Sequence, residues 1–178
     1  LVLPIPRGHP RYCHYGQTHR QWTSMAAVVT RREIAEAFDN GITYFNTFGG
    51  NPVSCAIGLA CLDVLEQEEL MTNTQAMSKA LMTGLAELRA AHELIGDVRG
   101  LGLYIGVELV TDRQARLPAT QAAKKIVESM KTQGVLVNTN GYDSNVLKIK
   151  PPMIIDHADV SHLLEAFESA LSELSVCR

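Results

Sequence analysis

The chain has 178 residues, of which 46% are hydrophobic and 20% are charged, and its formal net charge is −3. This length accommodates one sizeable core, or one domain and part of another. The charge balance lacks the basic excess typical of nucleic-acid binding, and every apolar stretch is shorter than the roughly 20 residues that a bilayer requires. We therefore expect neither a nucleic-acid nor a membrane partner. The first residue is Leu rather than Met, so residue 1 need not be the natural start.

The cysteines and histidines favour a reduced compartment and no metal site. The four cysteines form no CxxC pair, and Cys55 and Cys61 lie in an apolar helical run. Free Cys in such a run behaves as a small hydrophobe, which indicates a cytoplasmic location. His9, His14 and His19 recur every five residues, a spacing that fits neither a helix face nor a strand face. A zinc-binding N-terminal segment stays an alternative, which stoichiometric zinc binding dependent on His14 would support.

After this irregular N-terminal segment, the pattern becomes regular at Met25. Residues 25–29 predict a short buried strand, and the following helix has a capping box from Thr30 to Glu33. Gly41 ends that helix, and Pro52 suits the first turn of the next one. Apolar residues then recur at helical spacing at Val53, Ile57, Ala60, Val64 and Leu65.

The C-terminal half alternates predicted helices and strands, which is typical of a compact α/β subdomain. A helix over 71–91 carries one apolar stripe, and 97–110 predicts a strand in which apolar residues alternate with glycines. An amphipathic helix follows over 120–134, capped by Gly134. Short strands over 135–140 and 145–153 and a closing helix over 156–174, with Asp156 as N-cap, complete the pattern. The apolar stripe of the helix predicted over 71–91 consists of Met77, Leu81, Leu85 and Leu88.

The bend before the Pro52 helix has the composition of an anion-binding turn. Gly49 and Gly50 allow positive φ and a close approach of backbone amides, and Thr47 adds a hydroxyl donor. The helix that follows presents its positive end to the same place. A tight turn with Thr47 merely exposed explains the same residues, so the pattern alone leaves both interpretations open.

The run "YFNTFGGNPVSCAIGLACLDVLE" resembles the class-III aminotransferases, the fold-type-I enzymes that depend on pyridoxal 5'-phosphate (PLP). "MAAVVTRREIAEAF", "VRGLGLYIGVELV" and "NVLKIKPPM" extend the resemblance over about 25–175, closest to the branch of ethanolamine-phosphate phospho-lyase, 5-phosphohydroxylysine phospho-lyase and alanine–glyoxylate aminotransferase 2. It implies an α/β fold, with the end of a large domain and connecting helices over 25–91 and a small domain over 92–178.

The resemblance also implies a cofactor site shared between the subunits of a homodimer. Thr47 would donate to the phosphate of PLP bound mainly by the neighbouring subunit. Gly49, Gly50 and Asn51 would shape the turn around that phosphate.

The lysine that such enzymes link covalently to PLP is missing from its expected place. The family has a run like "MGKPIGNGHP" ahead of Met25, whereas this chain has no Lys before Lys79. Synonymous codons for Arg11 to Ser24 can be chosen so that the same DNA, read one base later and with the first base of the Met25 codon, encodes DIVTMGKPIGNGHP. The Lys codon of that peptide spans the codons of Gln17 and Thr18. We therefore hypothesise that residues 1–24 are an out-of-frame translation. The side chains of this segment would then have no function, including His9, His14, His19, Cys13 and Trp22. The competing interpretation is a divergent N-terminal extension.

The strand ending in "LKIKPPM" carries the expected substrate-binding residue. Most family members have an Arg at the position of Lys148, where it clamps a substrate carboxylate. Lys is a point charge and fits phosphate as readily as carboxylate. The LKIKPP run also resembles the phospho-lyases, and this resemblance implies a small amine substrate such as ethanolamine phosphate, which has no carboxylate to clamp. Phospho-lyase and transaminase chemistry both stay open, and so does a solvent-facing role for Lys148 and Lys150. Without its lysine, the chain as written is predicted to be inactive.

Three further positively charged residues are expected to have no part in the reaction. Arg99 has a structural role, as a salt bridge or a carbonyl contact. Lys124 and Lys125 lie on a solvated helix face. The alternative to an enzyme is a non-catalytic α/β module that dimerises or regulates a partner. A fragment separated from its large domain would expose the apolar surface that normally faces that domain, whereas a self-standing module would not.

Overall fold

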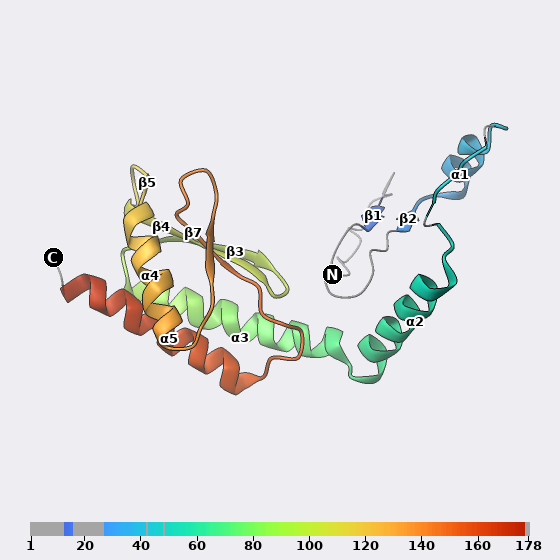
Figure 1. Cartoon of the computed structure of the whole chain (residues 1–178). Helices are drawn as coiled ribbons and strands as arrows, with labels where there is room; N and C mark the ends of the chain where they lie inside the picture. The colour runs from blue at the N-terminus through green and yellow to red at the C-terminus, as the bar shows by residue number, and fades with distance from the viewer. Residues whose placement is uncertain (1–12, 16–26, 42, 48, 177–178) are drawn as a thin grey trace. The chain divides into compact units, whose positions relative to one another are not determined.

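The computed structural model describes residues 13–15, 27–41, 43–47 and 49–176. They divide into two compact units, Leu1–Leu65 and Glu66–Arg178, which we describe separately (Figure 1). The division lies within the segment 25–91 that the sequence assigned to the large domain and its connecting helices.

The first unit contains short elements and one long helix. Strands β1 (Cys13–Tyr15) and β2 (Ala27–Val29) pair antiparallel, and α1 (Arg32–Phe38) follows. The N-cap of α1 is Arg31 and not Thr30, so the predicted capping box is wrong at that position. Glu33 instead forms an ion pair with Arg31 at 3.0 Å. Gly41 has the expected positive φ of 84° after the helix.

Helix α2 (Pro52–Gln67) begins at the predicted proline but has no buried residue. Its apolar sequence would suit the interior of a larger protein, because a helix that is apolar on most of its surface is normally covered by other elements. Four large apolar side chains of α2 are instead exposed by 45–68%: Val53, Leu59, Leu62 and Val64.

The second unit is a two-layer structure of three helices on one face of an antiparallel sheet (Figure 1). The strands are β3 (Ile95–Leu101), β4 (Tyr104–Asp112), β6 (Asn138–Asn140) and β7 (Val146–Ile149), in the order β3-β4-β7-β6, and β5 (Leu117–Pro118) pairs with β4. The helices are α3 (Leu70–Ala91), α4 (Thr120–Thr132) and α5 (His157–Val176).

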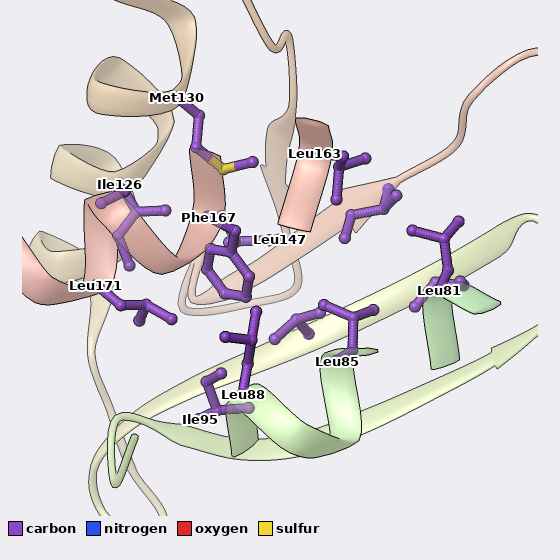
Figure 2. Close-up of a cluster of buried hydrophobic side chains, with 14 of the residues drawn as sticks. Leu81, Leu85, Leu88, Ile95, Ile126, Met130, Leu147, Leu163, Phe167 and Leu171 are labelled. Carbon is purple, nitrogen blue, oxygen red and sulfur yellow. The ribbon is translucent and has the colours of Figure 1, made fainter. Parts of the chain in front are cut away.

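The hydrophobic core fills the space between these helices and the sheet. The predicted stripe of α3 is confirmed, since its four apolar residues are at most 8% exposed. Figure 2 shows Phe167 of α5 among side chains from α3, α4 and β7. Burying large apolar side chains is the main favourable term in folding, so this core is what stabilises the second unit.

The segment 97–110, predicted as one strand, is in fact most of a hairpin. Gly102 has a φ of 56° and lies in the turn between β3 and β4, which pair from Leu101 with Tyr104 to Ile95 with Leu109. Leu103, Ile105 and Val107 alternate into the core as expected, whereas Leu101 is 52% exposed. Asp156 is confirmed as the N-cap of α5, because its Oδ1 accepts hydrogen bonds from the amides of Ala158 and Asp159 at 2.8 and 3.0 Å.

Candidate functional site

The glycine turn in the first unit is held by asparagine side chains. The amide of Gly49 donates to both the carbonyl and the Oδ1 of Asn46, each at 3.1 Å. Gly50 has a φ of 68°, a conformation that residues with a Cβ adopt only with strain. The sequence expectation of a bend that requires glycine is thereby confirmed for Gly50.

Asn51 links this turn to helix α2. Its Oδ1 accepts from the amide of Ser54 at 3.1 Å, and its carbonyl accepts from Cys55 at 3.0 Å, so Asn51 occupies the N-cap position. The amides of Gly50, Asn51 and Val53 have no acceptor in the part of the chain that the structure describes. They remain available to a ligand at the positive end of α2.

The phosphate end of PLP fits this donor set. Thr47 is exposed beside the free amides, and the first turn of α2 contains no acidic residue that would repel an anion. No Lys precedes Lys79 in the sequence, so the lysine that the resemblance implies for the aldehyde end of the cofactor is not at its expected place. Gln17 and Thr18, where that lysine is expected, lie outside the described residues.

A second group of candidate residues lies on the sheet of the second unit, on the face opposite to the helices. The strand register places Arg99 of β3 beside Gly106 of β4, and Gly106 beside Lys148 of β7. The core residues Ile105 and Leu147 point to the other face, because successive side chains of a strand alternate. Lys148 is half-buried, whereas Lys150 is exposed beyond the end of the strand.

Arg99 is held by two carboxylates, which confirms the expected salt bridge. Its Nη1 lies 2.8 Å from Oδ2 of Asp97 and 2.6 Å from Oε2 of Glu108. The hydrogen bond to Asp97 and then that to Glu108 raise the pKa of Arg99 above its ordinary value, so the guanidinium stays charged. In contrast, Lys148 has no carboxylate within 4.0 Å among the described side chains.

These residues line an open depression of about 360 Å³. Lys148 and Arg99 lie in its lining together with Tyr104, Gly106 and Asn140. Sequence reasoning identified Lys148 but missed Gly106 and Asn140. The register of three strands brings them together, and this register has no signature in any single segment.

The two groups lie in different units, so Thr47 and Lys148 are described separately.

Within the described residues, no three His, Cys, Asp or Glu side chains gather as metal ligands would. The side chain of His14 lies outside the described part of the chain. No helix in the described ranges is both long and apolar enough to cross a bilayer.

The family model described as aminotransferase class-III matches residues 22–171. The chain is 45% identical over 150 residues to an Arabidopsis thaliana protein named alanine–glyoxylate aminotransferase 2 homolog 2, mitochondrial, covering 84% of this chain and 31% of that protein. It is 40% identical over 149 residues to ethanolamine-phosphate phospho-lyase homolog 1 of Caenorhabditis elegans, covering 83% and 32%. The chain therefore belongs to the class-III aminotransferases, as its motifs predicted.

Solved structures confirm the fold class, which is part of a fold-type-I transferase. A phospholyase from Arthrobacter in complex with phosphoethanolamine superposes with a TM-score of 0.85 at 33% identity, covering 93% of this chain and 39% of that one. An amine transaminase from an uncultivated Pseudomonas species, in its PLP-bound form, gives 0.75 at 28% identity, covering 86% and 36%. The chain thus spans about a third of the length of its relatives.

Proposed function

We propose that this chain is the C-terminal part of a PLP-dependent class-III aminotransferase or phospho-lyase that acts on a small amine. The observation that carries the proposal is the family match over residues 22–171, which includes the turn with its free amides. The cofactor is PLP, which supplies the electron sink for reactions at an amine carbon. Thr47 and the amides that follow Gly49 hold its phosphate in a partner subunit of the homodimer.

The phospho-lyase branch has support from the depression in the second unit. Lys148 stands where a clamp for the substrate's anion is expected, and the depression around it is open. Ethanolamine phosphate has no carboxylate. A tetrahedral phosphate does not require the planar pair of N–H groups that an arginine offers to a carboxylate, so a lysine can bind it. The solved phospholyase that resembles this chain contains phosphoethanolamine. Lys148 therefore serves the anionic end of the substrate.

The chain as written does not turn over substrate, because the residues around Gln17 and Thr18 contain no lysine. The family match begins at residue 22, close to the point at which the expected reading frame resumes. An alignment with a Drosophila melanogaster relative covers 174 residues at 41% identity overall and so extends into this segment, which favours the competing interpretation of a divergent extension. One base inserted before the Met25 codon would join the lysine-containing frame to the rest.

The location in the cell stays a prediction. The cysteine pattern favours the cytoplasm, whereas two relatives are named as mitochondrial. An upstream targeting segment would decide between these compartments.

The experiment that tests this function uses the frame-restored gene with its upstream region. Replacing Thr47 by Val removes one charge-assisted hydrogen bond, and we expect the Kd for PLP to rise about 10-fold, or roughly 1.4 kcal/mol. Thr43→Val, an equal change at an exposed residue of the same segment, is the control and should leave the Kd within about 2-fold. Equal Kd values for the wild type and Thr47→Val would contradict the assignment of the turn.

The same experiment separates the enzyme from the non-catalytic module. The buried core of the second unit is what a self-standing module would have, whereas the exposed side chains of α2 favour a part of a larger enzyme. The frame-restored protein should trap PLP at one lysine on borohydride reduction, and the present chain should not. Trapping at one lysine of the present chain, together with turnover, would contradict its predicted inactivity.

A further inference from the structure

The row of Arg99, Gly106 and Lys148 leaves a gap between two cations. The three residues lie side by side on adjacent strands, with the glycine in the middle. Because neighbouring strands are about 4.8 Å apart, the two cationic residues start about 10 Å apart, and both are long enough to reach toward the middle. A Cβ on Gly106 would come within 3.2 Å of Cγ1 of Val146, so any side chain there would take up part of the depression.

Three side chains around this gap keep unused N–H groups. Asp97 and Glu108 both contact Nη1 of Arg99, which leaves Nη2 and Nε without an acceptor among the described residues. In the same part of the chain, the Nζ of Lys148 and the side-chain amide of Asn140 have no partner either. All three residues line the depression.

The number of donors decides which anion fits. The formal charges of Arg99, Lys148, Asp97 and Glu108 sum to zero, so long-range attraction is small and short contacts must hold the ligand. A carboxylate engaged by a guanidinium fork uses both of its oxygens on that fork. The three terminal oxygens of a phosphate monoester can meet the fork and Lys148 together.

We propose that Arg99 and Lys148 jointly bind the phosphate group of a phosphorylated small amine above Gly106, with Asn140 as a further donor. Gly106 determines the specificity, because its missing side chain provides the space for the phosphate. Arg99 thus binds ligand in addition to its ion pairs. The identity of the ligand rests on the proposed function, whereas the oxyanion site itself rests on the register and the free donors.

The test is a titration of the whole ¹⁵N-labelled chain with phosphoethanolamine at constant ionic strength, followed by NMR. We expect saturable shifts at the amides of 99–106, 140 and 146–148, with a Kd on the order of millimolar. Lys148→Met should weaken binding by at least about 5-fold. Lys124→Met, which removes the same charge from an exposed position on α4, should change the Kd by less than about 2-fold. Equal losses in the two variants would show a nonspecific effect of charge and overturn the site.

The role of Gly106 is tested without any change in charge. Gly106→Ala should weaken phosphoethanolamine binding and Gly106→Val should weaken it further, and thermal unfolding of each variant shows whether it is folded at the temperature of the titration. If Gly106→Val does not fold, the Ala variant alone decides, and unchanged binding in that variant overturns the inference.

Acetate should bind more weakly than phosphoethanolamine, and equal or tighter binding of acetate would overturn the choice of phosphate. Failure of this site leaves the effect of Thr47→Val on PLP binding intact, so it is distinguishable from failure of the proposed function.

Discussion

Arg99 is fixed by carboxylates on its own strand and on the neighbouring one. Asp97 lies two residues away on β3, and Glu108 projects from the paired strand β4. The raised pKa of Arg99 means that its contribution to stability is fully present below the pKa of the unfolded chain. That contribution is lost only as the pH rises through the still higher pKa of the folded state.

We therefore expect Arg99→Gln to destabilise the second unit by the same amount across the neutral range. The side chain is 53% exposed, so solvent screening limits the loss in the free energy of unfolding to about 1 kcal/mol or less. Urea unfolding of both proteins at about pH 6 and about pH 9 measures this difference. A difference that vanished at the higher pH would contradict the assignment.

Individual site residues were predictable to the extent that their roles are local. The bend at Gly50 depends on neighbours within a few residues, so the sequence carries its signal. The N-cap at Asn51 is equally local but was not predicted. The places of Gly106 beside Lys148 and of Asn140 beside Val146 depend on strand register instead. One sequence contains no direct record of that register.

At the scale of elements, helix α3 shows how periodicity predicts burial. Its apolar stripe recurs at the helical spacing and lies in the core, in contact with α5 and the sheet (Figure 2). The hairpin of β3 and β4 was missed, because Gly102 interrupts an alternation that otherwise continues on both sides. A glycine within a strand pattern is as typical of a bulge as of a turn.

Leu85→Ala should destabilise the second unit strongly. Leu85 is fully buried, and removing its side chain leaves a cavity that costs about 2–5 kcal/mol in the free energy of unfolding. Leu136→Ala is the matched control, since Leu136 of the same unit is 83% exposed and should change stability by less than about 0.5 kcal/mol. Chemical denaturation of both variants gives the comparison. Similar losses would mean that the core is not where the structure places it.

At the scale of the whole molecule, the two units differ in how well they bury apolar surface. The second unit encloses its own core, whereas α2 exposes Leu59 by 63% and Leu62 by 54%. A chain that spans about a third of its relatives is expected to expose surfaces that the remainder would cover.

The exposed face of α2 should make the isolated chain self-associate. Replacing Leu59 and Leu62 by Glu removes apolar surface and adds repulsion, so we expect a lower average mass in light scattering and less dye binding. A control with Gln67→Glu and Thr72→Glu adds the same charge at exposed polar positions and should leave the association unchanged. A wild-type chain that is monodisperse, with no effect of either pair, would favour the non-catalytic module.

The nucleotide sequence of the gene, from the Met25 codon to a few hundred bases upstream of the Leu1 codon, tests the central claim most directly. We expect the frame one base later to encode DIVTMGKPIGNGHP over the codons of residues 11–24, preceded by the rest of a class-III enzyme in that frame. Codons in this stretch that cannot encode that peptide, with no such enzyme upstream, would contradict the account.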